Sequence, residues 1–172
     1  MNAPRNYKHT IYLSLGSNIE PEKNIPKAID LLAGKVHVVS ISNAWKTPAV
    51  GSLGPDFLNA VIQINTDLDP NTLKTEILYP IESQLDRVRT SDKNAPRTID
   101  LDILIVDDII VDDEIWFRVY LAVPLAELEG ELIHTRSGQT IAEIAQLLKE
   151  TNAIQLQPHL FGVENRSDHE VS

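Results

Sequence analysis

The chain has 172 residues, of which 42% are hydrophobic, so it is long enough for one domain with a substantial core. Its formal net charge of −10 argues against non-specific binding to nucleic acids or to anionic membranes. It contains no cysteine, which excludes disulfide bonds and thiolate metal sites and is compatible with a cytoplasmic location. No apolar run approaches the roughly 20 residues of a membrane span, and residues 1–15 lack the apolar core of a secretory signal. We therefore expect one cytoplasmic domain over residues 1–172 that binds neither nucleic acid nor membrane.

The first third of the chain alternates between strand and helix patterns. Apolar residues at every second position predict a strand, and apolar residues three or four positions apart predict a helix. On these patterns we expect a strand at 10–15, a helix that begins near Pro26 and stops at Gly34, a long strand at 36–45, a loop at 47–55 and a strand at 57–66.

The rest of the chain starts with a longer amphipathic helix and ends in a polar tail. We expect a helix at 72–88, a polar loop at 89–96, a strand at 99–106 with a hairpin partner within 109–116, a helix from Pro124 and a helix at 140–150. The core of the domain then covers about residues 10–150, and residues 161–172 are expected to be disordered.

This order of elements, β-α-β-β-α-β followed by shorter pieces, predicts an α+β fold. It is the order of the ferredoxin-like split βαβ sandwich, in which helices pack on one face of an antiparallel sheet. The other face of the sheet is then left open, and a ligand can lie on it.

Two aspartates interrupt the apolar strand at 99–106. Asp100 and Asp102 share one face of the strand, whereas the alternate apolar residues from Ile99 to Ile105 point toward the core. A carboxylate on such a strand costs free energy unless a cation meets it. Paired oxygen ligands suit a hard cation such as Mg²⁺, and two such ions can clamp a phosphate chain. Because this spacing is common, a solvated polar face is the alternative interpretation.

Basic residues crowd the eleven positions just before this pair. Arg87, Arg89, Lys93 and Arg97 are four of the 15 lysines and arginines in the chain. We expect the first two at the end of the helix and the other two beside the polar loop. Guanidinium groups next to paired carboxylates are typical of a polyphosphate site. The alternative is a salt-bridge network in which the arginines pair directly with Asp100 or Asp102.

Several motifs in this chain, taken together, resemble one enzyme family. RVR (87–89) and PRTIDLDIL (96–104) resemble the signature of the 6-hydroxymethyl-7,8-dihydropterin pyrophosphokinase family. Its members transfer pyrophosphate from ATP to the hydroxymethyl group of the pterin in folate biosynthesis. Further similar segments are LSLGSN (13–18), WKTPAVGSLGPDFLNAV (45–61) and VPLAEL (123–128), so that the similarity runs from about residue 10 to about residue 150.

The resemblance implies a role for each matching residue. The catalytic residues it implies are Arg87, Arg97, Asp100 and Asp102, and the two aspartates are implied to hold two Mg²⁺ ions. The pterin-binding residues it implies are Thr47, Pro48, Val50, Phe57, Asn59 and Tyr120. The nucleotide-binding residues it implies are Glu82, Arg89, Lys93 and Arg118. Phe57 and Tyr120 are implied to sandwich the flat ring, although an aromatic residue by itself is more often part of a core.

The chain departs from the family pattern at 111–125, VDDEIWFRVYLAVPL. The usual leucine-proline-histidine-proline segment is missing there, and no histidine lies between His37 and His134. The alternatives to an active Mg²⁺-dependent enzyme are a catalytically weakened pterin- or nucleotide-binding homologue and a different metal-dependent transferase. Trp116 is a candidate to replace a lost contact. We also expect the loops at 47–55 and 89–96 to close over ATP and pterin, and the chain to be a monomer or weak dimer.

Overall fold

A computed structural model describes residues 3–51, 53–158 and 160–161. The described strands form a seven-stranded antiparallel sheet in the order β6-β5-β1-β4-β3-β7, and β2 also pairs with β4. Its strands are β1 (His9–Ser17), β2 (His37–Ile41), β3 (Ala44–Thr47), β4 (Phe57–Thr66), β5 (Asp100–Val106), β6 (Ile109–Ile110) and β7 (Gln155–Gln157). Apart from Phe161, the predicted disordered tail lies outside the described residues.

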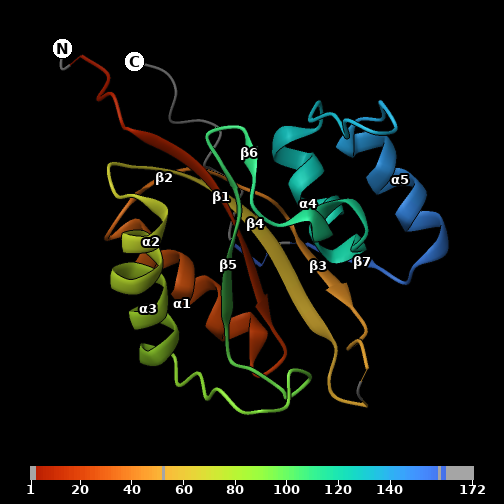
Figure 1. Cartoon of the computed structure of the whole chain (residues 1–172). Coiled ribbons are helices and arrows are strands. Elements are labelled where there is room, and N and C mark those ends of the chain that lie inside the picture. The colour runs from red at the N-terminus through yellow and green to blue at the C-terminus, as the bar shows by residue number, and fades with distance from the viewer. Residues whose placement is uncertain (1–2, 52, 159, 162–172) are drawn as a thin grey trace.

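Helices cover both faces of this sheet (Figure 1). The helical elements are α1 (Pro21–Ala33), α2 (Pro70–Leu73), the π-helical turn η1 (Lys74–Leu78), α3 (Tyr79–Gln84), the 3-10 turn η2 (Asp113–Trp116), α4 (Val119–Glu129) and α5 (Ile141–Thr151). No helix among the described residues is long and apolar enough to cross a membrane. The antiparallel sheet and the helices packed on it confirm the α+β class.

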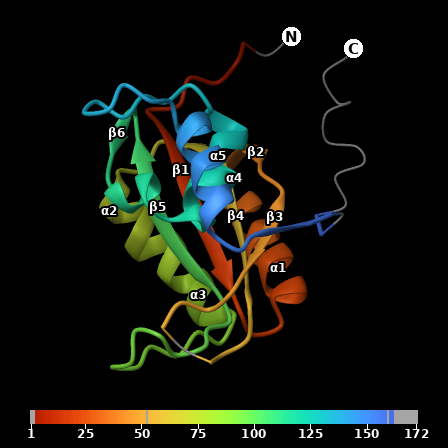
Figure 2. The ribbon, with the colours of Figure 1, turned by 90° about the vertical axis from the view of Figure 1, so that its right-hand side faces the viewer.

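The prediction that all helices pack on one face is wrong. One core lies between the sheet and the first helices, and it includes Ile25 and Leu32 of α1 and Ile81 of α3. A second core lies on the opposite face, where α4 and α5 bring Leu125 and Ile141 against the sheet. Figures 1 and 2 show α1–α3 on one side of the sheet and α4 with α5 on the other. Among the described residues, the part of this second face beyond α4 is left open.

A β-bulge in β5 divides its apolar residues between the two cores. Tyr12 pairs with Ile105 and Leu13 pairs with Ile103, so Leu104 is an extra residue opposite β1. Ile99 and Leu101 belong to the first core as predicted, but Ile105 belongs to the second core together with Leu104. The prediction that Ile105 shares a face with Ile99 is therefore wrong, because strict alternation holds only up to the bulge.

The predicted strand at 36–45 is two strands, separated at Ser42 and Asn43. Ser42 is 2% exposed, and its hydroxyl accepts a hydrogen bond of 2.8 Å from the backbone N–H of Val61. The backbone N–H of Ser42 in turn donates to the carbonyl of Val61. One side chain thus takes the place of a backbone group in the ladder, and the chain bends here between β2 and β3.

Two prolines that were expected to begin helices lie inside them. α1 begins at Pro21 and contains Pro26, and α4 begins at Val119 and contains Pro124. An internal proline removes one backbone hydrogen bond, but both helices are held by tertiary packing of their apolar residues, which contributes more to helix stability than propensity does. Gly34 follows the end of α1, as predicted.

The predicted helix at 72–88 is irregular and ends early. It runs from α2 through the π-helical turn η1 into α3, which ends at Gln84. The N–H of Tyr79 bonds to the carbonyl of Lys74, five residues back, and Pro80 follows with no N–H of its own. Arg87 and Arg89 consequently lie after the helix rather than at its end.

The remaining elements agree more closely with the sequence patterns. The hairpin partner of β5 is confirmed for Ile109–Ile110, across a two-residue turn in which Asp107 and Asp108 both have positive φ. The helix at 140–150 is confirmed as α5, which Thr140 begins with a capping box to Glu143.

Replacing Ser42 by alanine is expected to destabilise the fold. Ser42→Ala leaves the buried N–H of Val61 without its acceptor, which should lower the free energy of unfolding by about 1–3 kcal/mol. Thermal unfolding would then shift down by about 2–4 °C for each kcal/mol. Ser40→Ala is the control, because the Ser40 hydroxyl bonds only to the half-buried side chain of Gln63. Equal losses in the two variants would contradict this account of the strand break.

Candidate functional site

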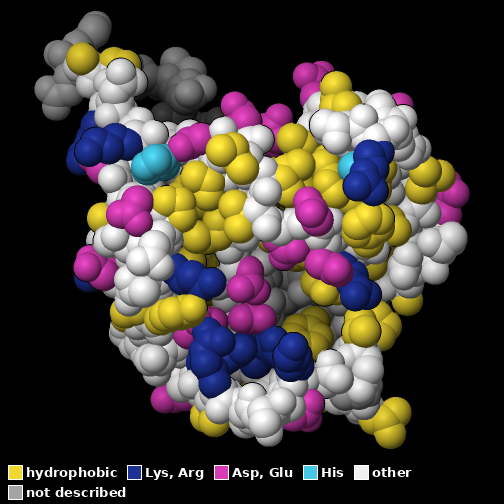
Figure 3. Space-filling view, viewed as in Figure 1, with side chains coloured by type: hydrophobic (Ala, Val, Ile, Leu, Met, Phe, Trp, Pro, Cys, Tyr) yellow, Lys and Arg dark blue, Asp and Glu magenta, His cyan; other side chains and the backbone are white. Residues whose placement is uncertain are grey.

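The open part of the second sheet face carries two adjoining hollows. The first, which we call the sheet pocket, has a volume of about 250 Å³ and lies between the ends of β1, β3, β4 and β5 and the start of α4. The second, the arginine pocket, has a volume of about 350 Å³ and lies along the loop before β5. Lys93, Arg97, Asp100 and Asp102 line both. Figure 3 shows acidic side chains in a hollow near the middle of this face, with a band of lysines and arginines along its lower border.

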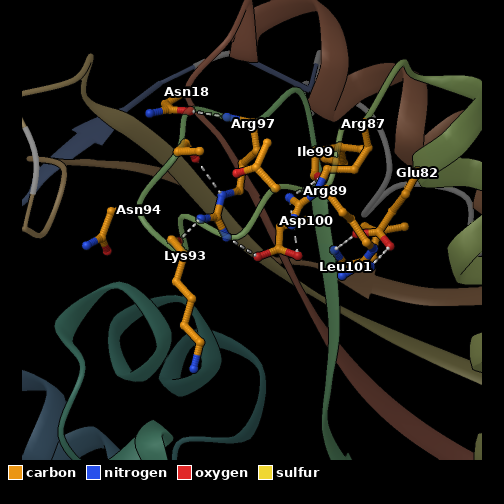
Figure 4. Close-up of polar contacts among 12 residues, drawn as sticks. Asn18, Glu82, Arg87, Arg89, Lys93, Asn94, Arg97, Ile99, Asp100 and Leu101 are labelled. Atoms are coloured by element: carbon orange, nitrogen blue, oxygen red, sulfur yellow. Dashed lines mark hydrogen bonds and ion pairs between the residues drawn. The ribbon is translucent and has the colours of Figure 1, made fainter.

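Asp100 is held by two arginines. Its carboxylate accepts a hydrogen bond of 3.0 Å from Nη1 of Arg97 and lies 3.5 Å from Nη1 of Arg87 (Figure 4). The three side chains are between 10% and 26% exposed, so the pairs are shielded from solvent far more than surface pairs. The salt-bridge network considered as an alternative is therefore present at Asp100.

Asp102 is in a different state from Asp100. Its carboxylate makes no hydrogen bond or ion pair with the residues that the structure describes, although it opens onto both pockets. Partial loss of hydration raises its pKa to about 6, and the negative charges of Asp100, Glu82 and Asp112 add to this effect. Asp102 thus has no direct ion-pair partner among the described residues, although the positive charge of Lys74 partly offsets the rise in its pKa, and it lies where the two pockets meet.

The loop before β5 is organised around Arg97 (Figure 4). The side chain of Arg97 donates to the carbonyls of Lys93 and Ala95. The backbone of Arg97 is fixed by Asn18, whose Oδ1 accepts from the Arg97 N–H at 2.8 Å. Asn18 lies in the loop after β1, so β1 and this loop are tied together. The guanidinium is positioned by the fold before any ligand arrives.

The six predicted pterin-binding residues all line the sheet pocket. They are Thr47, Pro48, Val50, Phe57, Asn59 and Tyr120. Asn59 is 7% exposed, and its amide donates a hydrogen bond of 3.0 Å to the hydroxyl of Thr47. The Arg97 guanidinium lies 5.9 Å from the centroid of the Phe57 ring. The pocket therefore combines aromatic surface with a buried amide.

Six of the eight predicted catalytic and nucleotide residues line the arginine pocket, and the other two do not. The pocket is lined by Arg87, Arg89, Lys93, Arg97, Asp100 and Asp102, whereas Glu82 and Arg118 line neither pocket. Glu82 is 2% exposed and accepts from Arg89 at 2.8 Å and from the N–H of Leu101 at 3.3 Å, while its burial raises its pKa. Glu82 thus acts behind the pocket, where it holds Arg89 and the start of β5.

Arg118 is held at the rim of the sheet pocket by an acidic residue. Its side chain is 46% exposed and pairs with Glu114 at 2.5 Å, and this hydrogen bond raises the pKa of Arg118. Glu114 itself lines the sheet pocket, as does Asp112. Trp116 lies outside the site, because it is 6% exposed in the second core and packs on His134. The suggestion that Trp116 replaces a lost contact is therefore wrong.

Several residues of the sheet pocket were missed by the sequence patterns. Besides Asp112 and Glu114, Asn94 and Gly16 line it. A Cβ atom at Gly16 would lie 3.3 Å from the Asn59 side-chain oxygen, so glycine leaves room for this amide. The acidic run at 112–114 was the only available signal for the rim. A Cβ at Gly51 would lie 3.1 Å from the Asn94 amide, so the described residues of the 47–55 and 89–96 loops meet beside the pocket.

The two aspartates are also the residues best suited to hold a metal ion. Among the described residues there is no group of three or more histidine, cysteine, aspartate or glutamate side chains that could form a complete metal site. A pair of carboxylates is nevertheless what Mg²⁺ uses when phosphate oxygens and water supply the other ligands. The unpaired carboxylate of Asp102 fits this use, and Asp100 can share it.

Comparisons with known proteins point to one enzyme family. The family model of 7,8-dihydro-6-hydroxymethylpterin-pyrophosphokinase (HPPK) matches residues 12–130. A 2-amino-4-hydroxy-6-hydroxymethyldihydropteridine pyrophosphokinase from Haemophilus influenzae is 32% identical over 161 residues, which are 87% of this chain and 99% of the relative. One from Methylorubrum extorquens is 36% identical over 144 residues, which are 77% of this chain and 89% of the relative.

A solved structure shows a similar fold. Wild-type Plasmodium falciparum HPPK-DHPS superimposes with a TM-score of 0.64 at 11% identity, covering 85% of this chain and 46% of that chain. At this low identity the likeness concerns the fold alone. The chain spans less than half of the length of that structure.

The unpaired carboxylate of Asp102 should reduce stability at neutral pH. Because its pKa is raised to about 6 in the folded state, from about 3.9 when unfolded, the folded state binds the proton more tightly, and ionisation above pH 6 opposes folding. After allowance for solvent screening, we expect Asp102→Asn to add about 1 kcal/mol at pH 7, or 2–4 °C in the unfolding temperature. The gain should vanish below about pH 4, where both states are protonated.

Asp100→Asn is the matched control for this measurement. It leaves Arg87 and Arg97 without their counter-charge and should therefore lower the unfolding temperature at pH 7. Thermal unfolding followed by circular dichroism at pH 4 and pH 7 distinguishes the two variants. A lower unfolding temperature for Asp102→Asn at pH 7 would contradict the assignment of Asp102 as an uncompensated charge.

Proposed function

The chain belongs to the 7,8-dihydro-6-hydroxymethylpterin-pyrophosphokinase family, and from this premise we propose that the two adjoining pockets are its substrate sites. The protein is a transferase of folate biosynthesis, which moves a pyrophosphate group from ATP to the hydroxymethyl group of 6-hydroxymethyl-7,8-dihydropterin. That the relatives are named as pyrophosphokinases favours the active enzyme over a weakened homologue.

One observation supports the placement of the two substrates more than any other. The residues with aromatic and amide groups line only the sheet pocket, the arginines at 87 and 89 line only the arginine pocket, and Asp100 and Asp102 lie where the pockets meet. A pterin ring and a triphosphate placed in these pockets would meet at the two aspartates. The pyrophosphate group that is transferred would therefore lie next to the metal ligands.

The sheet pocket has the chemistry that a pterin requires. A pterin is a flat ring with hydrogen-bond donors and acceptors along one edge, so it needs aromatic surface on its faces and fixed polar partners at its edge. We propose that Phe57 and Tyr120 contact the faces and that Asn59 and the 47–50 segment bind the edge. The buried amide of Asn59 has bonding capacity beyond its contact with Thr47.

The arginine pocket has the charge that a triphosphate requires. The protein has a net charge of −10, so an anionic substrate depends on local cations. Arg87, Arg89, Lys93 and Arg97 supply them, and their guanidinium groups can pair with phosphate oxygens. We propose that Arg87 and Arg97 stabilise the charge on the transferred group, and that Arg89 and Lys93 hold the rest of the nucleotide.

Magnesium fits the remaining part of the site, and we propose that Asp100 and Asp102 hold two ions. Bound there, the ions would neutralise phosphate charge and help to align the reacting groups. The chain's own residues position the pterin hydroxymethyl oxygen toward the β-phosphorus of ATP and exclude water. The hydroxymethyl oxygen loses its proton and forms a bond to the β-phosphorus, while the bond from the β-phosphorus to the oxygen that bridges it to the α-phosphate breaks, and AMP leaves with that oxygen. No residue needs to form a covalent intermediate.

The fold that carries this site is proposed to be the ferredoxin-like one. The strand order β5-β1-β4, with β2 and β3 beside β4, supports it, as does the position of α1 between β1 and β2 in the chain. On this interpretation α4 and α5 are additions to the second face, where α4 forms a wall of the sheet pocket. A cytoplasmic location and a monomeric or weakly dimeric state remain proposals from the sequence.

Release of AMP is the direct test of the proposed function. We expect the protein to release AMP from ATP only when both Mg²⁺ and 6-hydroxymethyl-7,8-dihydropterin are present. Asp102→Asn should reduce this rate by about 100-fold or more, because it removes a metal ligand, while calorimetry still detects pterin binding. Asp30→Asn, at an exposed position of α1, is the control and should leave the rate unchanged. Full activity of Asp102→Asn would refute the proposed metal site.

Pterin recognition by the sheet pocket is tested at Asn59. We expect Asn59→Ala to weaken pterin binding about tenfold or more, because a ring edge left without its partner in a buried site loses about 1–3 kcal/mol of binding free energy. ATP binding should stay within twofold of the wild-type value. Asn65→Ala is the control on the same strand, since Asn65 bonds to Thr10 away from the pocket. If Asn59→Ala retained full AMP release, a different metal-dependent transferase reaction would be favoured instead.

A further inference from the structure

Helix α4 carries two carboxylates near its carboxyl end, where acidic residues are electrostatically unfavourable. Glu127 and Glu129 lie in or beside the last turn, which contains no basic residue. Each makes a contact with the sheet instead. Glu129 accepts a hydrogen bond of 2.8 Å from the hydroxyl of Tyr12 in β1, and Glu127 binds to the segment where β3 begins. These contacts tie the helix to two different strands.

Glu127 uses both carboxylate oxygens on β3 and the residue before it. Oε1 accepts from the indole N–H of Trp45 at 2.5 Å. Oε2 accepts from the backbone N–H of Asn43 at 2.9 Å and from its side-chain amide at 3.1 Å. The ammonium group of Lys149 from α5 lies 5.1 Å from the centre of the Trp45 ring. Three donors from Asn43 and Trp45 thus converge on one side chain of α4.

The distances along α4 and β3 relate this contact to the sheet pocket. Tyr120, which lines the pocket, is seven residues before Glu127. Seven residues are about two helical turns, so the two side chains share a face of α4 and are about 10.5 Å apart along its axis. From Asn43 to Thr47, which also lines the pocket, an extended chain covers about 13 Å. The helix and the strand therefore lie side by side, with Glu127 joining them at one end and the pocket between them at the other.

The position of β3 also determines the polar wall of the pocket. Trp45 pairs with Asn59 and Thr47 pairs with Phe57 across the β3–β4 ladder. The hydroxyl of Thr47 accepts from the Asn59 amide. A shift of α4 relative to β3 would therefore leave Thr47 beside Asn59 and change the distance between this polar wall and Tyr120.

We propose that Glu127 is a positioning residue for the pterin, which holds α4 against the start of β3. In this way it keeps the aromatic wall at Tyr120 and the polar wall at Thr47 at the separation that a flat ring needs. The inference rests on the proposed function, because it takes the sheet pocket as the pterin site. It assigns to Glu127 no contact with either substrate.

Glutamine is the informative substitution because it keeps the size of the side chain. A glutamine has one acceptor oxygen, so its amide nitrogen would face either the indole N–H of Trp45 or the two N–H groups of Asn43. Glu127 is exposed, and exposed contacts contribute little to stability. Glu127→Gln should therefore fold normally and lower the unfolding temperature by no more than a few degrees.

The test compares Glu127→Gln with Glu129→Gln in the full chain. Glu129→Gln is the matched control, because it changes the other carboxylate of the same helix, whose partner Tyr12 lies on β1. We expect Glu127→Gln to raise the dissociation constant for pterin about tenfold, with the ATP constant within twofold of wild type. Glu129→Gln should leave both constants within twofold. Calorimetry with each ligand, and the Michaelis constant of each substrate in the AMP assay, measure these effects.

A double-mutant cycle with Trp45→Phe identifies the contact that matters. Trp45→Phe removes the indole N–H and keeps an aromatic ring, so its effect on pterin binding and that of Glu127→Gln should be less than additive. Pterin binding by Glu127→Gln within twofold of wild type would overturn the inference, as would an equal loss in Glu129→Gln. If the wild-type protein bound no pterin at all, the proposed function would fail first, and the two failures are thereby distinguished.

Discussion

The site depends on the unequal neutralisation of two neighbouring carboxylates. Asp100 is held by Arg97 and Arg87, whereas the carboxylate of Asp102 has no partner among the described residues. The two aspartates are two residues apart on one strand, so the fold cannot separate them. A protein under selection for stability alone would pair both or replace one. A site that receives cations and phosphates needs one carboxylate left available, and the raised pKa of Asp102 reflects that cost.

The surrounding fold makes this arrangement rigid. β5 is fixed to β1 along its length, and the buried carboxylate of Glu82 accepts from the N–H of Leu101 beneath the aspartates. The loop that carries Arg97 is tied to Asn18 after β1. The cations and carboxylates are therefore held by contacts made behind the pockets as well as by the ion pairs of Asp100 within them. Groups fixed in this way need little reorganisation when charge moves during a reaction.

The sequence predicted the residues of the site better than the way in which the chain encloses them. Strand alternation and the cluster of basic residues were sufficient to place Asp100, Asp102 and Arg97 together, because both signals are local. The bulge at Leu104 and the packing of α4 on the second face depend on contacts between distant segments, which periodicity does not report. Pro26 and Pro124 lie inside helices for the same reason, since tertiary packing outweighs the local preference of proline.

The chain takes a short path from β5 to α4, and Arg118 on this path lies beside the sheet pocket without lining it. Asp107 and Asp108 form a two-residue turn, and Asp107 accepts from the N–H of Thr10 and contacts His9, so the chain passes directly from the hairpin to η2 and α4. This short path brings Asp112 and Glu114 to the rim of the sheet pocket, and Glu114 binds Arg118 there.

The two pockets consequently differ in charge at their outer borders. An anionic phosphate chain is repelled by Asp112 and Glu114 and attracted by the arginines on the opposite side. These carboxylates do not repel a neutral ring, which can therefore lie on the acidic side. The absence of the leucine-proline-histidine-proline segment, noted from the sequence, therefore need not remove phosphate binding. On the proposed placement of the substrates, the acidic rim would favour phosphates in the arginine pocket and so help to orient the two substrates on one open sheet face.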